Sequence, residues 1–165
     1  MRALALAIAL CAAASAGCVR PVLAQLSEPK LKGAYVELGT IFGEAGWACE
    51  DEKWKDGSDW LRCKSGRDIL IVSLELVDGR PYVTFVQPWS QPLCKVAAFR
   101  GVVDKFNLDV PFASCECVDA QVLLIWTAMF LPDEGLPRAE LPALAKRWHK
   151  LVTASAAKGH LLDDL

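Results

Sequence analysis

The stretch at residues 68–87, DILIVSLELVDGRPYVTFVQ, decides the fold because two runs rich in β-branched and aromatic residues meet at Asp78-Gly79. Asp-Gly between such runs predicts a two-residue β-hairpin turn, since both central residues of that turn need a positive φ. We therefore expect an antiparallel hairpin here, and we place it at the centre of a sheet.

A second hairpin is expected just upstream, over residues 47–63, WACEDEKWKDGSDWLRC. If residues 55–57 form a three-residue loop with Gly57 in the left-handed conformation, Cys49 lies opposite Cys63. This register predicts a Cys49–Cys63 disulfide, with a metal-binding pair of thiols as the alternative. It also sets two pairs of opposite charges across the strands, Lys53 with Asp59 and Glu50 with Arg62.

Two tryptophans of the upstream hairpin are candidate partner-binding residues. The expected register places Trp54 and Trp60 on one face of an exposed hairpin, with Trp60 opposite Glu52. Tryptophan is enriched at the hot spots of protein interfaces, so both side chains are interpreted as anchors for another protein. The alternative is that they cover the sheet or the first helix.

Helices are expected on both sides of these hairpins. Apolar residues three and four apart predict a helix over residues 29–42. A second helix is expected over residues 92–107, capped by Ser90 or Gln91 with Pro92 in its first turn. The clearest helical stripe begins at Leu141, and Gly159 can close that helix.

Residues 111–131 predict one more hairpin, whose second strand, QVLLIWTAMFL, is apolar on both faces. Such a strand is either covered on two sides or placed in a contact between subunits. The elements together predict an α+β fold, in which an antiparallel meander, a C-terminal hairpin and about three helices follow the order α-ββββ-α-ββ-α.

The beginning of the sequence predicts export. Arg2 is followed by an apolar run from Ala3 to Ala14 that is too short to span a bilayer comfortably, which is typical of a signal peptide. We expect residues 1–24 to be the signal and residues 25–165 to form a single domain, periplasmic or secreted. Cleavage after Ala16 also fits the small-residue rule.

Cys18 indicates a different cellular location. Residues 15–18, SAGC, resemble a bacterial lipoprotein box, so cleavage before Cys18 would give a lipidated protein anchored at a membrane. Removal of residues 1–24 takes away two basic residues and no acidic one, which changes the net charge from −2 to −4. Nucleic acid is therefore not an expected partner, because binding phosphates needs a clustered positive field.

Three cysteines of the second half carry the sharpest chemical hypothesis. Cys115 and Cys117 are two residues apart on a predicted strand, so their side chains share a face. One of them is expected to form a disulfide with Cys94 from the preceding helix, which suits an oxidising compartment. The alternative is a thiolate site for a soft metal ion, with Cys94, Cys115 and Cys117 as ligands.

The sequence assembles no catalytic set and no cofactor site. Its two histidines are His149, expected on the wet side of the last helix, and His160, in the tail. Neither has a nucleophile or an acidic residue at a sequence spacing that would indicate a catalytic site. We therefore expect a protein without enzymatic activity.

The stretch from Val96 to Gly159 resembles the YbjN family of bacterial proteins, whose fold is similar to that of type III secretion chaperones. The resemblance rests on residues 102–107, VVDKFN, on residues 111–130, PFASCECVDAQVLLIWTAMF, and on an acidic loop before a long closing helix with Trp148. It implies a non-enzymatic binding domain that forms a homodimer.

The sequence thus predicts an exported, disulfide-stabilised, protein-binding or chaperone-like module of a bacterial cell envelope. A thiol-based metal-binding protein that uses Cys94, Cys115 and Cys117 is the alternative function.

Overall fold

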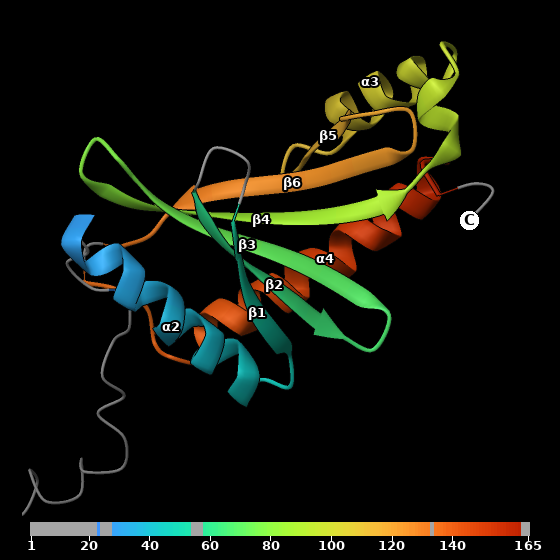
Figure 1. The fold of residues 1–165 in the computed structure, drawn as a ribbon. Coiled ribbons are helices and arrows are strands. Elements are labelled where there is room, and N and C mark those ends of the chain that lie inside the picture. The colour runs from blue at the N-terminus through green and yellow to red at the C-terminus, as the bar shows by residue number, and fades with distance from the viewer. Residues whose placement is uncertain (1–22, 24–27, 54–57, 133, 163–165) are drawn as a thin grey trace, which may run out of the picture.

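The computed structural model describes residues 23, 28–53, 58–132 and 134–162. Six strands form one antiparallel sheet in the order β1-β2-β3-β4-β6-β5, with three α-helices beside it (Figure 1). The elements in chain order are α2 (Glu28–Glu44), β1 (Ala48–Lys53), β2 (Asp59–Ser65), β3 (Asp68–Val77), β4 (Arg80–Ser90), a 3-10 helix (Pro92–Lys95), α3 (Phe99–Asp109), β5 (Ser114–Cys117), β6 (Val122–Phe130) and α4 (Glu140–Lys158). This is the predicted α+β order.

The central hairpin forms as its sequence predicts. Val77 pairs with Arg80, and the two residues between them have positive φ, 53° at Asp78 and 75° at Gly79. The Asp-Gly turn therefore sets the register of β3 on β4, and β4 in turn pairs with β6 along nine residue pairs. The hairpin lies in the middle of the sheet.

The upstream hairpin has the predicted register, with Cys49 opposite Cys63 and Lys53 opposite Asp59. Lys53 Nζ lies 2.6 Å from Asp59 Oδ1, which confirms one expected charge pair. The other expected pair is corrected: Arg62 faces Glu50 across the strands, but its guanidinium contacts Glu52 at 3.4 Å. A long side chain reaches the diagonal neighbour as easily as the one directly opposite.

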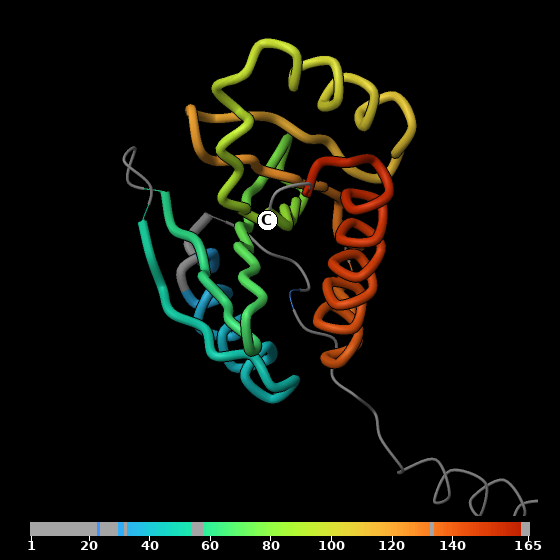
Figure 2. The backbone as a smooth tube through the Cα atoms, turned by 90° about the vertical axis from the view of Figure 1, so that its right-hand side faces the viewer, coloured from blue at the N-terminus to red at the C-terminus, as the bar shows by residue number. Residues whose placement is uncertain are grey.

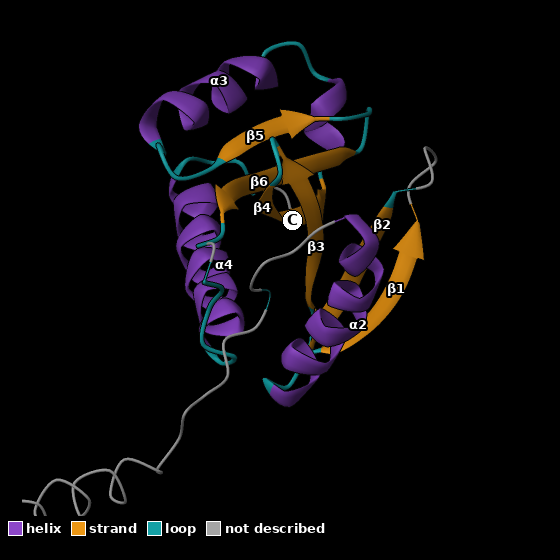
Figure 3. Ribbon diagram, turned by 90° about the vertical axis from the view of Figure 1, so that its left-hand side faces the viewer, coloured by secondary structure: helices purple, strands orange, loops and turns teal. Residues whose placement is uncertain are grey.

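One face of the sheet, which we call the inner face, carries the helices. In Figure 3, α2 lies in front of the strands β1 to β3, and α4 lies apart from it, to the left, beside β4 and β6. Alternate residues of β2, β3, β4 and β6 fill this face, and the helices add Leu38, Phe42 and Trp148 to the same core. The rings of Phe85 on β4 and Trp148 on α4 are 6.0 Å apart, so α4 packs directly on the central strand.

A tyrosine from α2 closes a gap in the sheet. The pairing of β2 with β3 ends at Leu61 and Val72, so the backbone of Leu74 has no partner on that side. The Tyr35 hydroxyl accepts a hydrogen bond from the Leu74 N–H at 2.7 Å and donates one to the Leu74 carbonyl at 2.9 Å. Because both groups are buried, this one side chain satisfies two backbone groups that would otherwise be costly.

The helix expected over residues 92–107 is split, which corrects the prediction. A 3-10 helix ends at Lys95, Val96 is extended with φ −93° and ψ 119°, and α3 starts only at Phe99. The break lets the short helix hold Cys94 next to β5 while α3 changes direction and packs along that strand. Gln91 is the cap, and its Oε1 accepts the Leu93 N–H at 3.1 Å.

The last helix begins and ends as predicted, with Gly159 as its C-cap. The left-handed residue that follows is His160, with φ 60°, and not the glycine. The tail then turns inward: Leu161 is fully buried, and its carbonyl accepts a hydrogen bond of 2.5 Å from the buried Gln91 amide. Leu161 therefore anchors the tail to the core, whereas residues 163–165 lie outside the described part.

Leu23 belongs to the core although it lies within the predicted signal peptide. Its side chain is 2% exposed and is part of the buried cluster of the inner face. Cleavage after Ala24 would remove it. The rest of the predicted signal, including Cys18, lies outside the described residues.

Candidate protein-binding surface

Two disulfides staple the sheet. Cys49 and Cys63 form the disulfide that the hairpin register predicts. Of the two candidates on β5, Cys117 is the one that bonds Cys94, which ties the 3-10 helix to the sheet. Cys115 is left as a free, buried thiol.

This pairing removes the ligand set of the alternative metal site. Two of its three proposed ligands, Cys94 and Cys117, are joined in a disulfide. Burial, with Glu116 nearby, raises the pKa of the Cys115 thiol to about 12, so the thiolate that a metal ion needs is disfavoured. The backbone of Cys115 is also held, because the Asn107 side chain accepts its N–H at 2.6 Å and donates to its carbonyl at 2.9 Å.

His149 is not the wet surface residue that its sequence position predicts. Its side chain is 12% exposed, its Nε2 lies 3.2 Å from Asp68 Oδ2, and its ring meets the edge of Trp47. The second ring nitrogen, Nδ1, is buried and has no hydrogen-bond partner among the described residues. The contact between His149 and Asp68 links α4 to the first residue of β3.

Of the two candidate tryptophans, the structure describes Trp60, and its side chain is buried. Trp60 faces Glu52 as predicted, but its side chain is 8% exposed. The alternative interpretation, in which it covers the sheet, therefore fits Trp60. Trp54 lies outside the described residues.

The second face of the sheet, which we call the outer face, is formed by the residues that alternate with the core. Strand pairing places one residue from each of the six strands in a single row across it: Glu50, Arg62, Ile71, Val86, Trp126 and Ser114. The centre of this row is apolar, and its charges lie on β1 and β2. Parallel rows add further apolar residues of β4 and β6: Tyr82, Pro88, Leu124, Ala128 and Phe130.

No helix among the described residues lies over the outer face. In Figure 2, the strands from β1 to β3 are nearer to the viewer than α2, and α4 lies to the right of them. Tyr82 and Phe130 pack edge to face at 5.0 Å, and the Arg80 guanidinium lies 4.6 Å from the centre of the Phe130 ring. Even with these neighbours, Phe130 is 44% exposed. The outer face is therefore apolar and partly exposed along β4 and β6, whereas Ile71 on β3 is 7% exposed. A partly exposed apolar surface of this kind can mark a protein-binding site.

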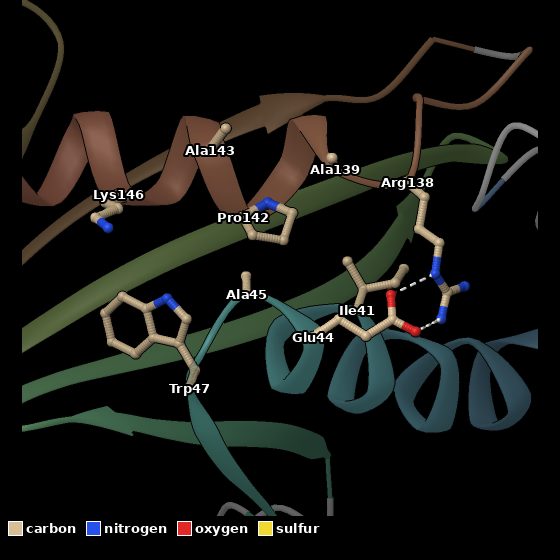
Figure 4. Close-up of a pocket in the computed structure, with 9 residues that line it drawn as sticks. All are labelled: Ile41, Glu44, Ala45, Trp47, Arg138, Ala139, Pro142, Ala143 and Lys146. Atoms are coloured by element: carbon tan, nitrogen blue, oxygen red, sulfur yellow. Dashed lines mark hydrogen bonds and ion pairs between the residues drawn. The ribbon is translucent and has the colours of Figure 1, made fainter. Parts of the chain in front are cut away.

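A cavity of about 360 Å³ separates the end of α2 from the start of α4 (Figure 4). Its lining is mostly apolar, with Ile41, Trp47 and Pro142 among its residues. Its one carboxylate, Glu44, accepts two hydrogen bonds from Arg138, at 2.7 and 2.8 Å, which lower the pKa of Glu44. A carboxylate held in its charged form by a bidentate arginine links the two helices and is poorly suited to proton transfer.

No helix of the described part is long and apolar enough to cross a membrane. The fold and the surface together define an α+β domain whose sheet has one face covered by helices and one face open.

The fold is similar to a solved structure. The crystal structure of YbjN, described as a proposed transcription regulator from E. coli, aligns with a TM-score of 0.50 and 8% sequence identity, over 75% of this chain and 89% of that one. The chain therefore has a YbjN-like fold, as the element order predicts. No protein-family model and no curated protein sequence matches the chain.

Proposed function

We propose that this chain is an exported, non-enzymatic protein-binding module of a bacterial cell envelope, chaperone-like in that it shields an apolar surface of its partner. The observation that carries the proposal is the open, apolar outer face. Water in contact with a broad apolar surface is costly, and burial against a partner removes that cost at roughly 25 cal/mol per Å².

The disulfides support the proposed location. Cys49–Cys63 and Cys94–Cys117 both join separate elements of the fold, and such bonds persist in oxidising compartments outside the cytoplasm. An apolar run near the start of the sequence gives a route of export. Lipidation at Cys18 would place the same module at a membrane surface, and the periplasmic or secreted form remains our first proposal.

The absence of enzymatic activity is part of the proposal and rests on the polar groups already described. Asp68 contacts one ring nitrogen of His149, and Arg138 forms an ion pair with the Glu44 carboxylate beside the cavity. The free thiol of Cys115 is buried and has a raised pKa. Each group is thus held in a structural contact or kept from ionising, which favours binding over catalysis.

Site-specific photo-crosslinking tests the proposed surface. A photoreactive residue at Val86, in the middle of the outer face, should give a covalent adduct with another polypeptide in cells that produce the protein. The matched control is the same residue at Leu108 on α3, which is 84% exposed but lies away from this face. Adducts that are absent at Val86, or equally frequent at Leu108, would exclude the outer face as the binding surface.

A further inference from the structure

We propose that the cavity between α2 and α4 is a binding site for a small aromatic carboxylate, a compact ring system that carries one negative charge. The cavity lies on the helix side of the sheet, so this inference goes beyond the proposed function and does not depend on the outer face. Three features carry it: the size of the cavity, the rigid rings in its walls, and a lysine whose charge has no partner among the described residues.

The volume of the cavity suits a compact ligand. At about 360 Å³ it lies near the lower end of the range of small-molecule sites, which is roughly 300–1,000 Å³. The end of α2 and the residues that follow it form one wall, and the first turns of α4 form the other (Figure 4). Ala45, Ala139 and Ala143 are among the lining residues, and their small side chains leave the space between the walls unfilled. The cavity therefore has room for a ligand of one or two rings.

Two rigid rings form part of the walls. Trp47 is 7% exposed, and its ring meets the ring of Phe42 edge to face at 6.4 Å and that of His149 at the same distance. These two contacts hold the indole in place before any ligand binds. Pro142 is a buried ring on the wall that α4 provides (Figure 4). Walls of this kind favour a flat apolar ligand, because little side-chain freedom is lost when the ligand binds.

Lys146 gives the site its charge. The lining contains three charged residues, and two of them, Glu44 and Arg138, neutralise one another through two hydrogen bonds. Lys146 is exposed and forms no ion pair among the described residues. In Figure 4 it lies above Trp47, at the end of the cavity opposite to the Glu44–Arg138 pair. A ligand whose ring lies against Trp47 therefore places a carboxylate beside the Lys146 ammonium.

Calorimetric titration with 2-naphthoate tests the site in the full chain as the producing cell processes it. We expect one molecule per chain and a dissociation constant of about 1 mM or below, the affinity that a compact ligand reaches with ordinary ligand efficiency. 2-Naphthamide has the same rings and no charge, and it should bind about three- to fivefold more weakly, because an exposed ion pair contributes little. No saturable binding of 2-naphthoate up to about 5 mM would overturn the inference.

Ala143→Phe tests the location. Ala143 is exposed on α4, so a larger side chain there fills the cavity from its rim and leaves the core unchanged. Binding of 2-naphthoate should weaken by about tenfold or more. Ala154→Phe, at an exposed position of the same helix outside the lining, is the matched control and should bind as the wild type does. Ala45→Phe on the opposite wall repeats the test if Ala143→Phe changes the midpoint of urea unfolding. Unchanged binding in both cavity variants would overturn the inference.

Lys146→Gln tests the charge. This variant should bind 2-naphthoate about three- to fivefold more weakly and 2-naphthamide as tightly as the wild type does, so the preference for the anion disappears. Lys150→Gln, exposed on α4 but outside the lining, is the control and should keep the preference. Equal binding of the two ligands by the wild type, or a preference that survives in Lys146→Gln, would overturn the assignment of an anionic ligand. The Val86 probe tests the proposed function separately, because the outer face is no part of this cavity.

Discussion

Replacement of Tyr35 by phenylalanine should destabilise the fold without changing its packing. The hydroxyl is the only atom lost, and it serves both the N–H and the carbonyl of Leu74. Tyr35 is 7% exposed, so water cannot readily take its place. The substitution removes two hydrogen bonds and leaves two buried backbone groups without partners. It should therefore lower the free energy of unfolding by about 2–4 kcal/mol.

Urea unfolding measures this change. For a protein of this size, the free energy of unfolding falls by roughly 1–3 kcal/mol per molar urea. The urea concentration at the midpoint of unfolding should therefore fall by about 1–2 M, while the dependence on urea stays the same. Burial also raises the pKa of Tyr35 above its ordinary value of 10.0. The unfolded chain therefore ionises first as the pH rises past 10, and stability present below that pH is lost as the pH climbs through the folded pKa. Tyr35→Phe should lack this loss.

Tyr82→Phe is the matched control. Tyr82 lies on the outer face against Phe130, and its hydroxyl makes no hydrogen bond among the described residues. We expect a change within about 0.5 kcal/mol. If Tyr35→Phe is equally mild, the gap between β2 and β3 must be filled by water or closed by a shift of the strands, and our account of that gap is refuted.

Three further predictions concern other parts of the fold. Asn107→Ala should cost about 1–3 kcal/mol in urea unfolding by releasing both backbone groups of Cys115, whereas Asn107→Asp, which keeps an acceptor for the N–H, should cost less. A chain that begins at Gln25 should be about 2–5 kcal/mol less stable in the same assay than one that retains Leu23, and equal stability would show that this leucine contributes nothing to the core. Because burial raises the pKa of Cys115 from 9.0 to about 12, stability should fall by at most about 1.4 kcal/mol per pH unit between these values, and a Cys115→Ala variant should not show this slope.

Local chemistry made the strands predictable. Asp78-Gly79 determines a register by itself, and the register of the upstream hairpin follows from a short loop, which is why the Cys49–Cys63 pairing could be read from spacing. The apolar character of both faces of β6 likewise indicated that its outer side would need a cover. These features depend on residues close together in the chain.

Features that depend on residues far apart in the chain could not be predicted from the sequence. The helical neighbours of His149 predict a solvated side chain, and only the fold brings Asp68 and Trp47 to it. Trp60 was expected on an exposed hairpin, whereas the continuous sheet buries it. The sequence spacing also left the partner of Cys94 open between Cys115 and Cys117, and only the fold brings Cys117 to it.

Asn107 makes the two ends of the sheet unequal. Its amide occupies the position that a neighbouring strand would take beside Cys115, so β5 cannot recruit another chain at that residue. The described residues hold no comparable amide against β1, whose protection is its short length and the acidic residues Glu50, Asp51 and Glu52. Edge-to-edge pairing of the sheet with another chain should therefore begin at β1 and not at β5.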